Sequence, residues 1–449
     1  MLLLPACRAG RKAVVGLLCR PTCFSFMADS APYSLLIIDA AQVLTLTGGA
    51  PDQPLAGPDA SGWTIIEHGY VACVADKIAA VGPMSELNRA RIGPETRLLD
   101  ATGRVVMPGL VECHTHLVFG GNRAHEFERK LRGETYLDIL ASGGGILSTV
   151  RATRAASEAE LLASALQHLA GFRHYGITTL EAKSGYGLDR DTELRLVRVA
   201  RAAGQQQAVR VVPTFLGAHV VPPEFKAAGP QAYVDFLLRE VLSDLKGEAA
   251  FVDIFCEEGA FPLDVARYYL EQAHKMGFGL KIHAEQLHDL GGCEMAAALG
   301  ATSVDHCDYL TPAAAARIAR QTQGRTVAVL LPLVPLFLRQ QQFAAGREFI
   351  DGGLPVALST DFNPGSCPSK NLWLAVSVAC LKMGLSPKEA VAAVTRNAAS
   401  ALGLAADCGS LEPGKRADIL VLNVGSVAEI PYWLGENPVR EVIIGGELG

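Results

Sequence analysis

The sequence predicts an α/β protein: a (β/α)8 TIM barrel with a small β-sandwich domain built from both chain ends. Two observations carry this prediction. From residue 106 onward, eight apolar, strand-like runs alternate with helix-like segments, which is the pattern of a parallel sheet whose strands are each followed by a helix. Before and after that region the apolar runs are short and are broken by Gly, Pro and Asp, as in antiparallel strands joined by turns.

Residues 1–26 differ in composition from the rest of the chain. They contain four basic residues and no acidic ones, and Pro5 and a basic cluster interrupt their apolar stretches. A secretory signal has one longer apolar core. We therefore expect the product of an upstream start codon, with Met27 opening the ordinary sequence; a targeting segment is the alternative. In either case the segment is left out of the predicted fold.

Residues 33–105 and 404–449 share a pattern of short strands and turns. Examples are SLLIIDAAQVLTL in the first segment and ADILVLNV in the second. Because roughly 45 residues bury too little apolar surface to fold alone, we expect the two segments to pair into one composite β-sandwich domain. A separate C-terminal domain is the alternative.

Residues 106–403 carry the barrel pattern over a length that suits this fold. One helix-like segment follows a capping box, Ser157 with Glu160, has leucines along one face, and stops at Gly176; each is a signal of an amphipathic helix or its boundary. PLDVARYYLEQAHKMG and TPAAAARIARQ have the same character. The eight strand-like runs are LVECHTH, TTLEAKSG, VRVVPTFLGAH, FVDIFCEE, LKIHAE, TSVDHC, TVAVLLP and PVALSTDF.

Composition and charge exclude several classes of protein. The chain has 49% hydrophobic residues and a formal net charge of −6, and its basic residues are scattered, so neither a nucleic-acid partner nor a membrane-surface patch is expected. No apolar run reaches the roughly 18 residues of a transmembrane helix. The 11 cysteines occur without paired spacing, which favours a reduced, cytoplasmic protein.

Polar residues stand where the predicted barrel strands end. The carboxyl ends of TIM-barrel strands meet on one face, where these barrels carry their active sites, and residues i and i+2 of a strand point to the same side. Imidazoles and a carboxylate at such a place can bind zinc or iron and leave a position for water. The residues are His114 and His116 after the first run, Lys183 and Tyr186 after the second, His219 after the third, Glu257 and Glu258 after the fourth, His283 in the fifth, His306 in the sixth and Asp361 in the eighth.

Two motifs resemble a known superfamily. PGLVECHTH resembles the first-strand signature of the amidohydrolase superfamily, and LEPGKRADILVL resembles a C-terminal β-sandwich strand of its members. Within the superfamily, several stretches are similar to the imidazolonepropionase family of histidine degradation, and the resemblance covers nearly the whole chain after residue 33. These stretches are HTHLVFGGNRAHEFERKLRGETYLDI, SGGGILSTVRATR, TTLEAKSGYGLD, TFLGAH, DIFCEEGAF, HAEQL and STDFNPGS.

The resemblance implies a metal centre and a reaction. His114, His116, His283 and Asp361 would bind one Zn²⁺ or Fe³⁺ per chain, and Asp361 and His306 would act in catalysis. The substrate would be the small molecule 4-imidazolone-5-propanoate, whose cyclic amide C–N bond is hydrolysed to give N-formimidoyl-L-glutamate, and a homodimer is expected. The residues implied to hold the substrate are Arg123, Tyr136, Tyr186, His219, Asn363, Gly365 and Ser366.

The chemistry of these residues agrees with the implied roles. Arg123 offers a planar fork to a carboxylate such as the propionate, although a surface salt bridge is the ordinary role of a single arginine. Asp361 can contact the metal and also accept a proton, and His306 can steady a developing oxyanion. In the TDFNPGS loop, backbone amides are expected to face the substrate, with an ordinary connecting loop as the alternative.

The position three residues after His283 separates the expected reaction from that of related ring deaminases. Those relatives carry a proton-shuttling Glu there. This chain has Gln286, which can bind a substrate amide or amidine but cannot transfer protons at neutral pH, and Glu285 is expected to point away from it. We therefore favour hydrolysis of the ring; the alternative is another cyclic amide or amidine hydrolase, or a deaminase, of the superfamily.

A second metal ion is not expected. Dinuclear relatives bridge their ions with a carbamylated Lys or a Glu on a middle strand. Here the fourth run ends without Lys and Lys183 lies on the second, while Glu257 is expected to act near the substrate or behind the metal. A non-catalytic scaffold would lack some of the four ligands, and all are present, so an enzyme is favoured.

Overall fold

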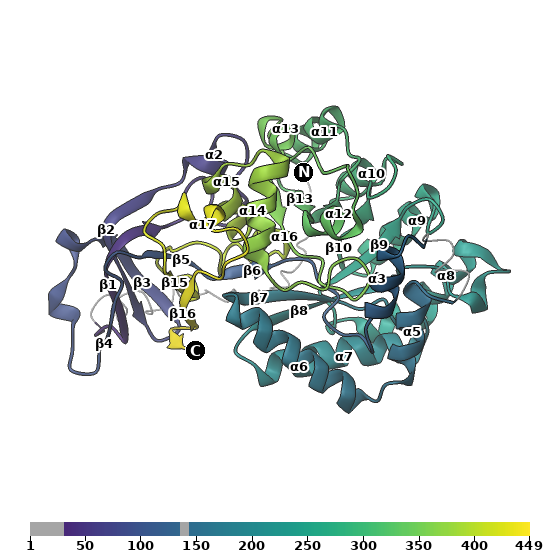
Figure 1. Cartoon of the computed structure of the whole chain (residues 1–449), viewed down its shortest axis with the longest axis horizontal. Helices are drawn as coiled ribbons and strands as arrows, with labels where there is room; N and C mark the ends of the chain where they lie inside the picture. The colour runs from purple at the N-terminus through teal and green to yellow at the C-terminus, as the bar shows by residue number, and fades with distance from the viewer. Residues whose placement is uncertain (1–30, 135–142) are drawn as a thin grey trace, which may run out of the picture.

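The structure of the chain is a computed structural model that describes residues 31–134 and 143–449 (Figure 1). The predictions made for residues 1–26 and for Tyr136 lie outside the described residues. Within those ranges the strands form a parallel barrel sheet and a separate mixed sheet, which lie side by side (Figure 1).

The parallel sheet contains all eight predicted strand runs. Its order follows the chain from β6 to β14, as successive strand–helix–strand connections require. The fifth run is interrupted and contributes two short strands, β10 beside β9 and β11 between β9 and β12. The strands are β6 (Leu110–Glu112), β7 (Ile177–Lys183), β8 (Arg210–Ala218), β9 (Phe251–Cys256), β10 (Gly279–Leu280), β11 (His283–Ala284), β12 (Ser303–His306), β13 (Val327–Leu330) and β14 (Val356–Leu358).

The barrel closes between its last and first strands mainly through side chains, a junction that we call the seam. Among the described residues, β14 and β6 share no strand ladder, but a parallel bridge pairs Thr115 with Phe362. The Ser359 hydroxyl and the Thr360 N–H both donate to Glu112 Oε1, the latter over 3.0 Å. Burial raises the pKa of Glu112 to about 7, and these two donors face its carboxyl group inside the barrel.

Helices cover the outside of the barrel (Figure 1). The predicted capping box is present at the start of α6, with both reciprocal hydrogen bonds between Ser157 and Glu160. Gly176, just past its end, has φ +86°, a conformation that favours glycine. None of the helices in the described ranges has the length and apolar character of a membrane span. The helices of the barrel region are α3 (Ala124–Leu131), α5 (Ile146–Ala155), α6 (Glu158–His174), α7 (Arg190–Gln206), α8 (Gly229–Glu240), α9 (Leu263–Lys275), α10 (Gly292–Ala298), α11 (Pro312–Thr322), α12 (Leu333–Leu338), α13 (Gly346–Asp351), α14 (Leu372–Met383), α15 (Pro387–Ala393) and α16 (Arg396–Ala401).

The mixed sheet joins the two ends of the chain, as predicted. β15 pairs antiparallel with β5, and the sheet fits a small β-sandwich. Gly109 links β5 to the first barrel strand, and a Cβ there would lie 2.4 Å from Thr178 Cγ2, so the close passage requires glycine. The division into domains stays a prediction. The strands are β1 (Leu35–Leu44), β2 (Ile65–Val74), β3 (Lys77–Pro83), β4 (Arg97–Asp100), β5 (Val105–Pro108), β15 (Ile419–Leu422), β16 (Val439–Ile444) and β17 (Glu447–Leu448), with short helices α2 (Asp59–Gly62) and α17 (Glu429–Tyr432) beside them.

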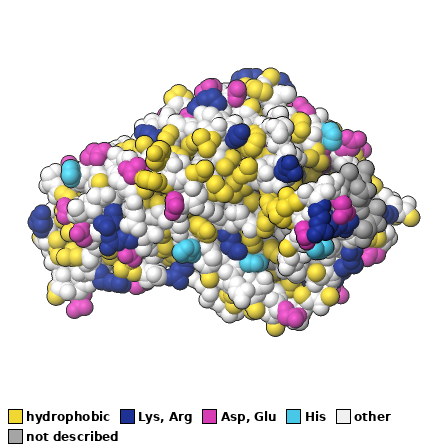
Figure 2. Space-filling model, in the orientation of Figure 1, with side chains coloured by type: hydrophobic (Ala, Val, Ile, Leu, Met, Phe, Trp, Pro, Cys, Tyr) yellow, Lys and Arg dark blue, Asp and Glu magenta, His cyan; other side chains and the backbone are white. Residues whose placement is uncertain are grey.

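One face of the molecule carries a group of exposed apolar side chains. Figure 2 shows them gathered over the region of α14 and α17, and the exposed members there are Leu381, Tyr432, Trp433 and Leu434. Patches of this kind mark interaction surfaces in many proteins. The homodimer expected from the sequence stays a prediction.

Candidate active site

The residues predicted to bind a metal ion converge at the carboxyl end of the barrel. His114 and His116 follow β6, His283 begins β11, and Asp361 follows β14. The Nε2 atoms of His114 and His116 lie 3.5 and 3.3 Å from Asp361 Oδ1, and the centroids of the His114 and His283 rings are 4.5 Å apart. All four side chains are buried.

Several buried polar atoms of this cluster have no hydrogen-bond partner within the described ranges. They include His114 Nε2, His283 Nε2 and Asp361 Oδ1. An unpaired buried polar atom costs about 1–3 kcal/mol, so such a cluster suits a set of metal donors. Donor atoms of His114, His116 and Asp361 lie within 4.8 Å of one another, and so do those of His114, His283 and His306. The residues therefore fit a metal ion, with His306 as a further imidazole beside the four predicted ligands.

The charges of the cluster are those that a metal site needs. Burial lowers the pKa of His116 to about 4 and holds the pKa values of His219 and His306 well below their usual range, so these rings are neutral at neutral pH. Burial acts to raise the pKa of Asp361, but the close rings of His114 and His116 outweigh it and hold that pKa well below its usual range. The pKa of His114 is itself raised, because its contacts with Asp305 and Asp361 outweigh burial. A charged carboxylate thus sits beside the neutral rings of His116 and His306.

Two buried carboxylates stand behind the histidines. Asp305 Oδ2 lies 2.6 Å from His114 Nδ1, and Asp253 Oδ2 lies 3.0 Å from His283 Nδ1. Carboxylates at this position fix the tautomer and orientation of metal-binding histidines. Neither aspartate was predicted from the sequence. An acidic residue within a buried apolar strand, as in FVDIF and TSVDH, is a signal because charged side chains are rarely buried without a partner.

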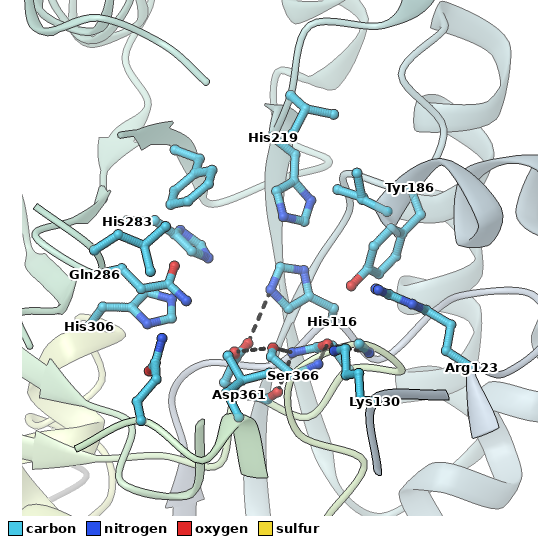
Figure 3. A pocket seen from close by; sticks show the side chains of 18 of the residues that line it. His116, Arg123, Lys130, Tyr186, His219, His283, Gln286, His306, Asp361 and Ser366 are labelled. Carbon is cyan, nitrogen blue, oxygen red and sulfur yellow. Dashed lines mark hydrogen bonds and ion pairs between the residues drawn. The ribbon is translucent and has the colours of Figure 1, made fainter. Parts of the chain in front are cut away.

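A cavity of about 570 Å³ opens at the carboxyl face of the barrel, and the side chains of His116, His283, His306 and Asp361 point into it (Figure 3). Nearly all predicted site residues within the described ranges line it. His114 is buried and does not belong to the lining. The predicted residues that line the cavity are His116, Arg123, Tyr186, His219, His283, Gln286, His306, Asp361, Asn363, Gly365 and Ser366.

Arg123 lines the cavity and is also ion-paired. Its Nε and Nη2 atoms both lie 2.8 Å from Glu126 Oε2, and Glu126 Oε1 accepts from the Gly145 N–H over 3.1 Å. A side chain at Gly365 would overlap Arg123 Nη1, so the glycine leaves room for the guanidinium. The ion pair is not a surface salt bridge, because the Arg123 and Glu126 side chains are only 12% and 2% exposed.

Tyr186 and His219 form an aromatic wall beside His116. The rings of His116 and His219 are stacked at 5.2 Å between centroids, and Tyr186 lies 5.5 Å from each of them. His219 Nδ1 lies 3.1 Å from Gly185 O, which can only accept, so Nδ1 carries the proton and Nε2 offers a lone pair. Figure 3 shows the Tyr186 hydroxyl beside the Arg123 guanidinium.

The polar groups of the loop after β14 are used to support Asp361, and few of its hydrogen-bond donors are left to face the cavity. Asn363 Oδ1 accepts from the N–H groups of Gly365 and Ser366 over 2.7 and 2.8 Å, and Asn363 Nδ2 donates to Asp361 O over 2.7 Å. The Ser366 hydroxyl donates to Asp361 Oδ2 over 3.1 Å. The two backbone amides predicted to face a substrate are therefore occupied within the loop.

The residues after His283 point in different directions. The Gln286 side chain lines the cavity. Glu285 turns away, with φ +51°, and its carboxylate accepts from the Gly292 and Cys293 N–H groups at the start of α10. Glu257 accepts from Leu287 N–H over 2.8 Å, so it anchors this segment from behind.

Comparisons with known proteins decide the family. The amidohydrolase family model matches residues 105–449. Imidazolonepropionase of Symbiobacterium thermophilum is 45% identical over 421 residues, 93% of this chain and 97% of the relative. Imidazolonepropionase of Geobacillus kaustophilus is 44% identical over 418 residues, 92% of this chain and 97% of the relative.

The chain belongs to the imidazolonepropionase family of amidohydrolases.

Solved structures show the same fold at lower identity. An adenosine deaminase from Xanthomonas campestris with bound zinc matches with a TM-score of 0.69 and 18% identity, over 93% of each chain. A triazine hydrolase variant matches with a TM-score of 0.68 and 17% identity. At these identities the likeness concerns the fold alone, and the imidazolonepropionase-family assignment rests on the sequence relatives.

The cavity of this imidazolonepropionase-family chain has further cationic residues that the sequence analysis did not single out. Lys130 and Arg339 line it together with Arg123. Lys130 follows Arg123 by seven residues, close to two helical turns. This spacing places both side chains on the same side of α3, and it could have indicated Lys130 from the sequence. For Arg339, which follows α12, the sequence offered no comparable signal.

Proposed function

We propose that the chain hydrolyses 4-imidazolone-5-propanoate, opening its ring at the cyclic amide C–N bond to give N-formimidoyl-L-glutamate. The observation that carries this proposal is one cavity whose walls present both a metal-type donor cluster and Arg123. The cluster suits attack of water on a ring carbonyl, and the guanidinium suits a substrate carboxylate. The names of the relatives support the same reaction.

The proposal includes one metal ion per chain, either Zn²⁺ or Fe³⁺. When bound, such an ion polarises a carbonyl group and lowers the pKa of water toward neutrality. A count of one is supported by the carboxylates behind the site, because Asp253 and Asp305 already face the ammonium of Lys183 and are not free to bridge a second ion. The proposed ligands are His114, His116, His283 and Asp361.

Asp361 is the proposed proton carrier. Its carboxylate is charged, and the hydrogen bond from Ser366 holds it toward the cavity. It would accept a proton from the attacking water and deliver it to the leaving ring nitrogen as the C–N bond breaks, so that the water oxygen ends on carbon and the proton on nitrogen. The neutral ring of His306 lines the same cavity, where its N–H can donate to the developing oxyanion.

The remaining walls of the cavity are proposed to orient the substrate. Arg123 would take the propionate, while Tyr186 and His219 would pack against the ring and offer it hydrogen bonds. The side-chain amide of Gln286 has no partner among the described residues and lines the cavity, so it is available to a ring amide or amidine. Tyr136 stays in the proposal on the family resemblance alone.

The direct test is to add the purified chain to freshly generated 4-imidazolone-5-propanoate and to follow the decay of its ultraviolet absorbance. Decay with formation of N-formimidoyl-L-glutamate and without ammonia supports the proposal. Release of ammonia would favour the alternative, a ring deaminase of the superfamily, and the absence of turnover by metal-loaded protein would overturn the proposal.

Replacing Arg123 by Ala is expected to lower kcat/KM for 4-imidazolone-5-propanoate roughly 100-fold, because a charge-assisted pair contributes about 1.5–3 kcal/mol. Arg123→Lys should recover only part of this, since the fork geometry is lost. Metal content, measured by elemental analysis, should stay unchanged in both variants.

Two controls separate a carboxylate contact from a general disturbance. A ring analogue without the carboxylate should be processed poorly, and about equally by wild type and Arg123→Ala; a further equal loss with both substrates would contradict the assignment. Lys130 is a second cation on the same wall, and Lys130→Met is expected to cost less than about 10-fold. A larger loss of kcat/KM in Lys130→Met than in Arg123→Ala would indicate that Lys130, and not Arg123, binds the substrate carboxylate.

One buried side chain, Glu193, holds the loop that carries Tyr186. Its carboxylate accepts from the N–H groups of Gly185, Gly187 and Leu188 over 3.0, 2.7 and 2.9 Å. Glu193→Gln turns an N–H₂ group toward these donors, so the free energy of unfolding should fall by about 1–3 kcal/mol. KM should rise more than kcat falls, because Tyr186 and His219 lose their support.

Denaturant unfolding and steady-state kinetics measure the two effects of Glu193→Gln. The matched control is Glu160→Gln, which makes the same change at an exposed acceptor of backbone N–H in the capping box. Because Gln also forms capping boxes, it should cost less than about 0.5 kcal/mol of stability and leave KM unchanged. An unchanged KM in a destabilised Glu193→Gln protein would show that the loop does not position the substrate wall.

A further inference from the structure

A cluster of five charged side chains lies inside the barrel behind the proposed metal centre. Each of them has 0% side-chain exposure. Charged groups buried to this degree are costly unless their partners compensate them. The proposed hydrolysis gives no direct task to any of them. They are Glu181 and Lys183 of β7, Asp253 of β9, Lys281 between β10 and β11, and Asp305 of β12.

Lys183 is the centre of this cluster. Its ammonium nitrogen lies 2.7 Å from Asp253 Oδ2, 3.0 Å from Glu181 Oε2 and 3.3 Å from Asp305 Oδ2. The two aspartate oxygens are the same atoms that face the histidines: Asp253 Oδ2 lies 3.0 Å from His283 Nδ1, and Asp305 Oδ2 lies 2.6 Å from His114 Nδ1. One ammonium therefore connects the carboxylates behind two of the proposed ligands.

We propose that Lys183 is a positioning residue of the metal centre. Its ammonium holds the carboxylates of Asp253 and Asp305 in place, so that each would accept the Nδ1–H of its histidine and leave Nε2 as the metal-binding atom. Two buried carboxylates without a shared cation repel one another and lose hydration. The inference rests on the proposed function for the metal ligands and adds the group that arranges them.

The chain offers a matched control in Lys281. It has the same residue type and the same burial, and it lies in the same cluster. Its ammonium nitrogen is 3.3 Å from Glu181 Oε1 and 3.5 Å from Cys113 O, but no ion pair to Asp253 or Asp305 is formed in the described part of the chain. Loss of Lys281 therefore removes a buried charge without removing the connection between the two carboxylates.

The experiment compares zinc affinity in wild type, Lys183→Met and Lys281→Met by competition with a chromophoric chelator. Removing a group that supports metal ligands typically weakens binding about 10–100-fold, and we expect a loss in this range for Lys183→Met and less than about 3-fold for Lys281→Met. Lys183→Gln keeps a donor and the approximate size but not the charge, so it provides a second variant and should resemble Lys183→Met. Equal zinc affinity in the Lys183 variants and wild type overturns the inference, as does an equal loss in Lys281→Met.

A measurement on the wild-type protein tests the same arrangement without a substitution. In the zinc-loaded enzyme with ¹⁵N-labelled histidine, the resonances that move on zinc binding should include two rings protonated at Nδ1. Unprotonated Nδ1 atoms in these rings would overturn the inference. Failure of the proposed function is distinguishable, because it would appear in wild type as absence of turnover, whereas failure of the present inference leaves wild-type turnover intact.

Discussion

Replacing Asp361 by Asn is expected to lower kcat at least about 10³-fold. General acid–base groups contribute typically 10²–10⁴-fold, and this substitution also weakens a proposed metal ligand. Asn has nearly the same shape, but it carries no charge and cannot take up the proton. In the structure Asp361 Oδ1 lies 3.3 Å from His116 Nε2, and Oδ2 accepts from the Ser366 hydroxyl over 3.1 Å, so both oxygens have a task that the amide nitrogen of Asn cannot perform.

Ser366→Ala is the control for Asp361→Asn. It removes one hydrogen bond to the charged carboxylate, worth about 1.5–3 kcal/mol, while the carboxylate itself stays. A loss of roughly 10–100-fold in kcat is expected, smaller than that of Asp361→Asn. Steady-state kinetics with metal-saturated proteins make the comparison, and retention of more than a tenth of the wild-type kcat by Asp361→Asn would exclude it as the proton carrier.

Replacing His283 by Ala is expected to weaken zinc binding by more than about 100-fold. Even residues that only support ligands cost about 10–100-fold when they are changed, and His283 presents a ring nitrogen directly to the cluster. At stoichiometric zinc the variant should lose activity in parallel with its metal content. Elemental analysis after gel filtration and activity assays across a zinc titration measure the two quantities.

His168→Ala is a control matched in residue type. His168 lies outside the proposed ligand set; its ring stacks on Phe119 at 5.2 Å, and its Nδ1 lies 3.2 Å from Leu117 O. The variant should lose packing but keep its zinc. If His283→Ala instead bound zinc as tightly as His168→Ala does, His283 would not be a ligand.

The barrel and the place of its site were predictable because both depend on short-range signals. Apolar runs alternating with amphipathic segments identify the strands, and His114, His116, His283 and Asp361 stand at strand ends, where a barrel brings residues together. What each side chain contacts depends on long-range packing. Lys183 and Asp253 lie in runs that the sequence predicts as buried strands. That they meet inside the barrel depends on how their two strands and the strand between them are aligned, which the sequence does not show. Asn363 is a different case, because its amide forms its hydrogen bonds within its own loop.

The seam of the barrel has a consequence for the order of folding. Ser359 and Glu112, which meet there, are 247 residues apart in the chain, whereas neighbouring strands elsewhere in the barrel are joined by much shorter segments. The entropic cost of closing a loop rises with its length, and contacts between distant segments form slowly. The seam should therefore form late in folding, and its amide hydrogens should exchange with solvent sooner than those of the central strands. His116 and Asp361 lie on opposite sides of it, so an ion held between them would slow this exchange, because opening the seam requires its release.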